Sequence, residues 1–154
     1  MKRITFIGVA VLICSTARAQ NRETGDFNFD GHMDYRESSQ ERGNQCGWWR
    51  YYIYDASISQ HRAVETSLCK EQFDAERKLV RSEVSGGMAG LIYAIHYFRW
   101  DGFTLVAVRA EKQDYDPGRN LFIRTQVTNI DSVSGPTVVA RILTPEEAEV
   151  RADQ

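Results

Sequence analysis

The stretch LIYAIHYFRWDGFTLVAVRAE, residues 91–111, contains two apolar runs typical of β-strands, and Asp101-Gly102 separates them. An Asp-Gly pair between two such runs is the strongest short-range signal for a β-hairpin, because both residues accept the positive φ angles of a two-residue turn. The stretch therefore predicts two antiparallel strands, over 91–100 and 103–111.

Strand-like segments also lie on both sides of this hairpin. WWRYYIYD is aromatic and apolar except for Arg50, RKLVRSEVS alternates between two faces, and two β-branched runs follow the hairpin. These segments occupy residues 48–55, 77–85, 121–130 and 137–143. We predict a mainly β fold, a single-domain antiparallel β-sheet or sandwich resembling a propeller blade.

Helix signals are few. Thr144 can cap a helix, Pro145 suits its first position, and Glu147 completes a capping box, which predicts a short C-terminal helix. The segment AVETSLCKEQF, residues 63–73, is compatible with a further turn or two of helix.

The first nineteen residues have the pattern of a Sec-type signal peptide. Lys2 and Arg3 precede an apolar run over 4–14, and Ala17-Arg18-Ala19 forms an A-x-A cleavage site. The apolar run is shorter than the roughly 20 residues that span a bilayer. We therefore predict a signal peptide over 1–19 and a single β domain over 20–154, located in the periplasm and not in a membrane.

The charge balance becomes more acidic once this leader is removed. The chain has 19 basic and 21 acidic residues, and the leader contains Lys2, Arg3, Arg18 and no acid, which leaves 16 and 21 and a net charge of −5. A nucleic-acid-binding protein needs a basic face, so that function class is disfavoured. An acidic surface suits a basic partner protein.

The cysteines indicate one disulfide bond. Cys14 leaves with the leader, and Ile13 before it departs from the small residue that a lipid-attachment site requires. Cys46 and Cys69 remain, and in an oxidising compartment they are expected to pair. Two buried thiols are the alternative, and a zinc site is disfavoured because neither cysteine belongs to a C-x₂-C pair.

A cluster of oxygen-bearing side chains precedes the strands in GDFNFDGHMDYRES, residues 25–38. Residues 26–37 match D-x-[DN]-x-[DN]-G-x₅-E, the pattern of an EF-hand calcium loop, with Gly31 at the sharp turn. Ca²⁺ takes six to eight oxygens, and carboxylates crowded this closely repel one another without a cation. We predict a structural Ca²⁺ site in a loop that leads into a β-strand, with these ligands: Asp26, Asn28, Asp30, the backbone carbonyl of His32, Asp34 and Glu37.

Two alternatives to this calcium site remain. An Asp/Asn-Gly segment also forms ordinary solvated turns between strands. Mg²⁺ is less suited to the loop, because it keeps several waters and rarely takes an all-protein cage.

The order of these motifs resembles a family of small periplasmic calcium-loop proteins. The matching pieces are DFNFDGHMD, YIYD, FDAERKLVRSEVSGG and YFRWDGFTLVAVR, which together cover roughly 25–109. Members include immunity proteins that neutralise peptidoglycan-cleaving effectors, such as those delivered by type IV secretion systems, and their fold is similar to that of periplasmic inhibitors of i-type lysozyme. The resemblance implies a mainly β fold, bound Ca²⁺ and inhibition of a hydrolase by plugging its cleft.

Lysozyme inhibitors of several types use an S-G-x-x-Y loop as the plug. The present chain has a glycine-rich segment that begins with Ser-Gly, although its tyrosine comes later than in that motif. The resemblance therefore implies this partner-binding loop: Ser85, Gly86, Gly87, Met88, Ala89 and Gly90, with Tyr93 nearby. A flexible hairpin tip without a partner is the alternative.

The aromatic segment 48–55 allows two interpretations. Its Trp and Tyr side chains suit an exposed sugar-binding platform, but packing is the commoner role of an aromatic strand, so we expect one face to be core. His96 lies on the same strand face as Ile92 and Phe98 and is expected to be partly buried. No nucleophile motif, metal-protease motif or definable pair of catalytic carboxylates is present, so no enzyme class is supported.

The sequence thus predicts an exported Ca²⁺-binding protein that binds and inhibits a lysozyme-like peptidoglycan hydrolase. One rival is a non-catalytic structural or adhesive calcium module of the cell envelope, and another is an enzyme that itself acts on cell-wall sugars. The latter requires a paired, pKa-shifted carboxylate site in a cleft. The sequence leaves open whether the protein is a monomer or a homodimer.

Overall fold

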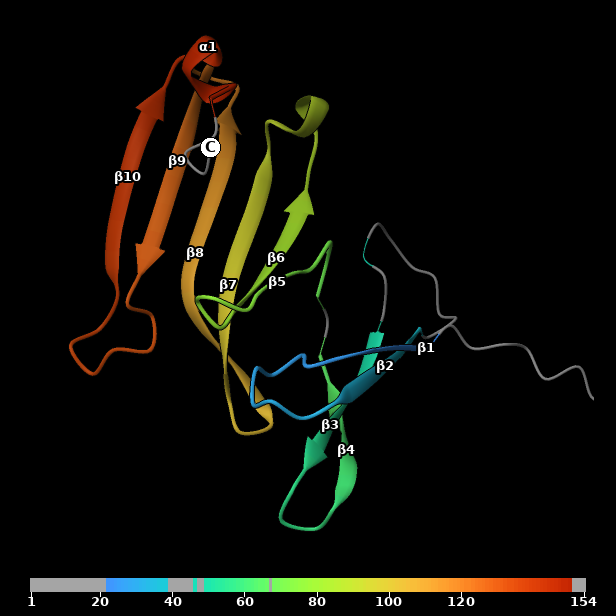
Figure 1. Cartoon of the computed structure of the whole chain (residues 1–154). Coiled ribbons are helices and arrows are strands. Elements are labelled where there is room, and N and C mark those ends of the chain that lie inside the picture. Colours follow the sequence, from blue (N-terminus) through green and yellow to red (C-terminus); the bar gives the residue numbers. More distant parts are fainter. Residues whose placement is uncertain (1–21, 39–45, 47–48, 67, 151–154) are drawn as a thin grey trace, which may run out of the picture.

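The computed structural model of the chain consists of two antiparallel β-sheets, one short α-helix and a single 3₁₀ turn, η1 (Met88–Gly90), which confirms the predicted mainly β fold (Figure 1). The structure describes residues 22–38, 46, 49–66 and 68–150. The predicted signal peptide, residues 1–19, lies outside this range. None of the described helices is long and apolar enough to cross a membrane.

The smaller sheet has four strands in chain order, β1 (Arg22–Gly25), β2 (Asp34–Ser38), β3 (Trp49–Asp55) and β4 (Gln60–Glu65). The larger sheet has six strands, which follow one another in reverse chain order. They are β10 (Thr137–Leu143), β9 (Leu121–Thr128), β8 (Thr104–Asp116), β7 (Tyr93–Asp101), β6 (Leu79–Ser85) and β5 (Gln72–Asp74).

The predicted hairpin is the centre of the larger sheet, formed by β7 and β8. Asp101 pairs with Thr104, so the two-residue turn is Gly102-Phe103, one residue later than expected. Gly102 has φ +56°, and a glycine at the first turn position is typical of a type II′ turn. A register shift at Tyr97/Phe98 bends the pair, and β8 continues to Asp116.

The other predicted strands correspond to β3, β6, β9 and β10. The prediction of helical turns over 63–73 is wrong, because that segment contains the last three residues of β4 and the first two of β5. Its backbone follows the edge of β6, where the N–H of Glu83 donates to the carbonyl of Cys69 at 2.7 Å. This tertiary pairing overrides the local helix signal.

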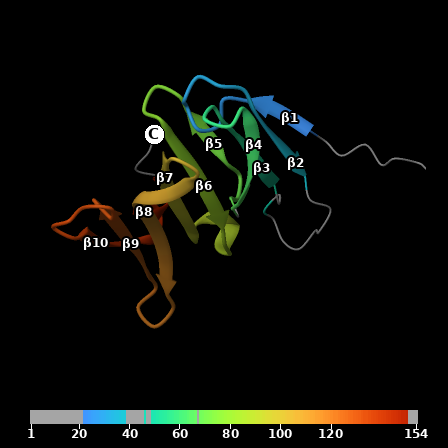
Figure 2. The ribbon, with the colours of Figure 1, turned by 90° about the horizontal axis from the view of Figure 1, so that it is seen from below.

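The hydrophobic core lies between the smaller sheet and the β5–β8 part of the larger sheet. Its buried members come from several elements: Phe27, Tyr51, Ile53, Leu68 and Val80. Half-buried apolar residues of β7 and β8 pack against them. In Figures 1 and 2, β9 and β10 lie on the side of the larger sheet away from the smaller one. The sandwich therefore covers only part of the larger sheet.

The predicted short C-terminal helix is present as α1 (Pro145–Ala148), and it folds back onto β9 and β10. Thr144 and Glu147 form the expected capping box, with N–H···O distances of 3.3 and 2.8 Å. Arg124 of β9 donates to the carbonyls of Ala148 at 3.4 Å and Val150 at 2.8 Å. These bonds hold the C-terminal turn against the sheet.

Candidate functional site

The predicted calcium loop joins β1 to β2 as a hairpin connection in which Gly25 pairs with Asp34. The Asp26 carboxylate accepts hydrogen bonds from the N–H groups of Asp30 (3.1 Å) and Gly31 (2.9 Å). Gly31 has φ +88°, which a residue with a side chain rarely adopts. The loop is therefore wrapped around the side chain of its first acidic residue.

The structure brings the side chains of Asp26, Asn28 and Asp30 to this one turn. Asn28 Nδ2 donates to Asp30 Oδ2 at 2.8 Å, and the N–H of His32 donates to Asp30 Oδ1 at 2.8 Å. These oxygens are the hard ligands that Ca²⁺ prefers. Within the described ranges, no group of three or more His, Cys, Asp or Glu side chains is placed to hold a metal ion.

Asp34 is buried and connects the loop to β3. Its Oδ2 accepts from the N–H of Phe27 at 2.9 Å and its Oδ1 from the N–H of Tyr54 at 2.8 Å. Burial raises the pKa of Asp34 above its usual value, and the backbone N–H groups of Tyr54, Phe27 and Asn28 act in the opposite direction. The Asp34 side chain therefore has a structural role, because it joins the loop to β3.

Glu37 is not brought to the loop. It lies on β2 directly opposite Arg22 of β1, and the two form an ion pair with an Nη2–Oε1 distance of 2.9 Å. Glu37 is three strand residues beyond Asp34, which corresponds to roughly 10 Å of strand. The remaining oxygen-donor set is therefore Asp26, Asn28, Asp30, the His32 carbonyl and Asp34.

The predicted partner-binding loop is the turn that joins β6 to β7, and we call residues 85–90 the tip. It stands beyond the ends of these strands, at the same end of the sheet as α1 (Figure 1). The N–H of Gly86 donates to the carbonyl of Ile92 at 2.6 Å, which closes the base of the turn. Met88, Ala89 and Gly90 have φ values of +54°, +54° and +90°. The tip is thus a sharply folded turn with a defined conformation.

Gly86 and Gly87, the first two glycines of the tip, differ in the room that each leaves for a side chain. A Cβ atom on Gly86 would lie 2.9 Å from Ile92 Cγ2, so this position has no room for a side chain. A Cβ atom on Gly87 would meet nothing closer than 4.0 Å, and the Met88 side chain is 45% exposed. Gly86 therefore serves the fold of the tip, while Gly87 and Met88 form its accessible surface.

Tyr93, which was predicted to lie near the partner-binding loop, does not have an exposed side chain. It is buried in β7, and its hydroxyl donates to Glu111 Oε1 of β8 at 2.5 Å. The residue opposite it on β6 is Ser85, so Tyr93 begins the strand and is not part of the exposed turn. The structure thus separates Tyr93 from the surface that a partner can contact.

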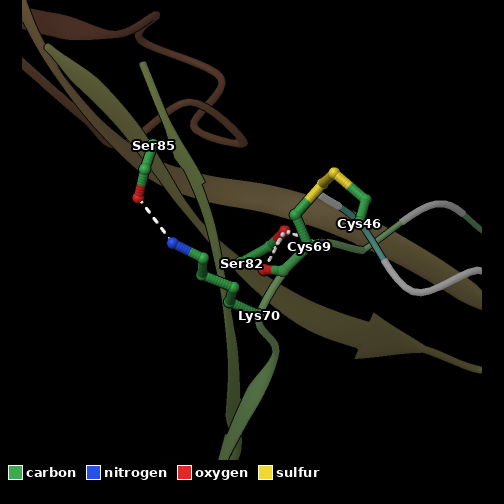
Figure 3. The surroundings of a disulfide bond; sticks show 5 residues. All are labelled: Cys46, Cys69, Lys70, Ser82 and Ser85. Atoms are coloured by element: carbon green, nitrogen blue, oxygen red, sulfur yellow. Dashed lines mark hydrogen bonds between the residues drawn. A yellow bond between two sulfur atoms is a disulfide. The ribbon is translucent and has the colours of Figure 1, made fainter. Parts of the chain in front are cut away.

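The disulfide between Cys46 and Cys69 is formed as predicted, and it lies next to the base of the tip. Figure 3 shows that the N–H of Cys69 donates to Ser82 Oγ at 2.8 Å, while Lys70 Nζ donates to Ser85 Oγ at 2.7 Å. The cross-linked segment therefore supports the first residue of the tip. Sequence reasoning missed Lys70, because no local pattern connects it with a residue fifteen positions away.

The aromatic strand β3 divides between two faces. Tyr51 is fully buried in the core, as expected for one face. On the other face Tyr52 stacks on Tyr35 with ring centroids 4.4 Å apart, and His61 packs against Tyr54 at 5.3 Å. Trp48, which was considered for a sugar-binding platform, lies outside the described residues. His96 is partly buried, as expected.

Comparisons with known proteins support the fold. Neither a scan against models of protein families nor a search of curated proteins finds a match. One solved structure, described as that of a Xanthomonas type IV secretion system related protein, matches with a TM-score of 0.59 and 16% sequence identity. The match covers 82% of this chain and 62% of that one, so this chain corresponds to less than two thirds of that protein. At this identity the likeness shows a shared fold.

Proposed function

We propose that this protein is an exported periplasmic inhibitor or immunity protein that blocks a lysozyme-like peptidoglycan hydrolase with its tip. The observation that carries the proposal is the tip itself, a folded and exposed turn beyond the end of the sheet whose base is held by Gly86 and Lys70. Two further points support it: the fold is shared with a type IV secretion system related protein, and the disulfide suits an oxidising compartment.

The conformation of the tip is suited to entering a cleft. A turn that is already folded loses less conformational entropy when it binds than a flexible loop does. Its small residues allow the backbone to approach a partner closely, so that its N–H groups can bond the paired carboxylates of a glycoside hydrolase. Met88 adds an exposed apolar contact. The protein acts here by occupying the cleft and has no catalytic role of its own.

We propose that Asp26, Asn28 and Asp30, with the His32 carbonyl and Asp34, hold a structural Ca²⁺. The cation would offset the repulsion among these carboxylates and stabilise the β1–β2 hairpin. The loop, which is blue between β1 and β2, is well separated from the tip in Figure 1. Calcium would therefore stabilise the fold and would not contact the target.

The inhibition is tested by measuring peptidoglycan lysis with a panel of lysozymes and of hydrolases encoded beside this gene. We expect stoichiometric inhibition of one of them by wild-type protein and its loss in Gly87→Trp with Met88→Glu, two changes for which the tip has room. Val133→Glu is the matched control, because Val133 is fully exposed in another loop. Inhibition that survives the tip variant would place the interface elsewhere.

If no hydrolase of the panel is inhibited, the protein is better explained as a structural or adhesive module of the envelope.

The calcium proposal is tested separately, by thermal unfolding with Ca²⁺ and with a chelator. Calcium at about a hundred times its Kd should stabilise wild-type protein by about 2.7 kcal/mol. Asp30→Ala should lose most of this gain, whereas Asp131→Ala, in an unrelated loop, should keep it. Equal protection of wild type and Asp30→Ala would reject the loop as the site.

A further inference from the structure

The two sheets have four edge strands, and three of them have features that prevent pairing with another chain. β5 has only three residues, and β1 carries Arg22 and Glu23 among its four. β4 carries His61 and Arg62. Shortness and charge are the usual protections of edge strands in natural proteins. The fourth edge, β10, is a seven-residue strand with only one charged residue, Arg141.

β10 is a seven-residue strand with the sequence TVVARIL and a single charge. It pairs with β9 from Thr137 to Leu143 in one continuous register, so no bulge turns it away. Val138, Val139 and Ile142 are 60, 48 and 63% exposed. In the part of the chain that the structure describes, no strand pairs with the outer edge of β10. A long, apolar, regular edge of this kind is a template for a further strand.

The sequence of β10 is complementary to itself in one antiparallel register. Successive side chains of a strand point to opposite faces of the sheet, and directly opposed residues of two antiparallel strands must point to the same face. In a symmetric pair the twofold axis, perpendicular to the sheet, must therefore lie at a residue that faces its own counterpart in the second copy. An axis at Arg141 would set two arginines opposite each other, which is unfavourable. An axis at Val139 would shorten the pairing by two residues.

An axis at Ala140 pairs all seven residues. Val138 then lies opposite Ile142 of the second copy, on one face, and Val139 lies opposite Arg141 on the other. Ala140 faces its own counterpart, where its small side chain causes no crowding. Apolar and β-branched cross-strand pairs of this kind stabilise antiparallel sheets.

We propose that the protein forms a symmetric dimer by antiparallel pairing of β10 with β10 of a second copy, with the twofold axis at Ala140. The larger sheets of the two copies then form one continuous sheet. The contact is isologous and therefore closes at two copies. One strand pair covers less surface than a standard interface of about 1,600 Å², so we expect a dissociation constant in the micromolar range. The proposal is independent of the hydrolase and of calcium.

The dimer is tested by sedimentation velocity of the chain purified from the periplasm of an expression host, below and above that range. We expect a concentration-dependent dimer for wild type. Val138→Lys with Ile142→Lys should be monomeric, because like charges then face each other across the axis. Val138→Lys with Ile142→Glu should dimerise, because each lysine then faces a glutamate. Both positions are exposed, so each variant should keep the wild-type circular dichroism and melting temperature.

The register is tested by oxidative cross-linking of single cysteine variants. Ala140→Cys should give a covalent dimer on a non-reducing gel, because directly opposed residues of antiparallel strands have Cα atoms about 4.5–5.5 Å apart, within disulfide reach. Val139→Cys and Arg141→Cys should cross-link far less, because each faces the other position. A wild-type chain that stays monomeric throughout, or Lys/Lys and Lys/Glu variants that behave alike, would overturn the proposal and leave β10 to a different partner strand.

Discussion

Asp34 shows how one carboxylate can hold the smaller sheet together. It is fully buried and accepts hydrogen bonds from the N–H groups of Phe27 and Tyr54, which belong to the loop and to β3. Asp34→Ala leaves both donors without a partner, and hydrogen bonds to a charged group contribute about 1.5–3 kcal/mol each. We expect the free energy of unfolding to fall by about 3 kcal/mol.

Urea unfolding in the presence of a chelator measures this effect without any contribution from metal binding. Asp34→Asn is the matched control, since it keeps one acceptor oxygen and should lie between Asp34→Ala and wild type. An Asp34→Ala protein as stable as wild type in the chelator would show that the carboxylate serves metal binding alone.

Tyr51 makes the stability of the core sensitive to alkaline pH. Burial, with a smaller contribution from the Glu71 carboxylate, raises its pKa to about 12. An unfolded tyrosine ionises near pH 10. The stabilisation is therefore complete below pH 10 and is lost as the pH rises through 12. A raised pKa of this size corresponds to roughly 2 to 3 kcal/mol.

Tyr51→Phe has no group that ionises in this range, so its stability should fall less than that of wild type between pH 9 and pH 12. Unfolding by urea at several pH values measures the difference, and the other titrating groups are common to both proteins. Parallel pH curves for the two proteins would show that Tyr51 is solvated or ionised in the fold.

The candidate site could be predicted from the sequence only where its residues are close in the chain. The turn built on Asp26, Asn28 and Asp30 follows from local spacing, and so does the tip. Lys70 and Glu37 depend on their strand partners Ser85 and Arg22, which no local pattern specifies. Tyr93 lies next to the tip, but the burial of its side chain depends on the sheet that surrounds it.

At the scale of elements, the disulfide and the segment beside β6 belong to one unit. Cys46 and Cys69 close a loop with a sequence separation of 23, and this cross-link is worth about 3 kcal/mol in the chain-entropy account. Replacing both cysteines with serine should lower the free energy of unfolding by about that amount. The measurement is urea unfolding of the variant beside oxidised wild-type protein.

Reduced wild-type protein provides the control for that variant, since it lacks the cross-link but keeps both side chains. If the serine variant were much less stable than reduced wild type, the loss would come from packing of Cys69, which is 7% exposed, and not from the cross-link. Equal stability of all three proteins would mean that the cross-link adds nothing.

Strands could be predicted wherever residues with high β propensity form an uninterrupted run. β10 matches its predicted range, and β9 differs from its range only at the end. The β7–β8 turn is displaced by one residue, because the pairing of Asp101 with Thr104 leaves Gly102 to provide the positive φ. β1 was missed because its residues RETG have no strand signal and pair only through β2. Local pattern therefore predicts the elements, and pairing sets their ends.

At the scale of the whole molecule, the sheet order could not be read from the chain. The smaller sheet covers the β5–β8 part of the larger one, so the core and the exposed β10 edge lie on different parts of the molecule. This separation leaves three surfaces with distinct positions: the loop beside the core, the tip at the strand ends and the β10 edge. Changes to one surface should therefore have little effect on the others.

This independence predicts the stoichiometry of the inhibited complex, provided that both the dimer and the inhibitory tip are correct. The tip lies between β6 and β7, so four strand spacings separate it from the axis beside β10. The two tips of a dimer are then roughly 40 Å apart across the sheet. Because the β10 strands are antiparallel, the tips also point in opposite directions. Each tip can engage a hydrolase without obstruction by the other.

We therefore expect a complex of two inhibitors and two hydrolases for wild-type protein, and of one and one for Val138→Lys with Ile142→Lys, measured by light scattering. Inhibition per tip should be the same for both, because the substituted edge is remote from the tip. The Gly87→Trp with Met88→Glu variant should show the reverse, a normal dimer that binds no hydrolase. A monomeric β10 variant that no longer inhibits would mean that the inhibitory surface spans both copies, and the separation of tip and edge would be rejected.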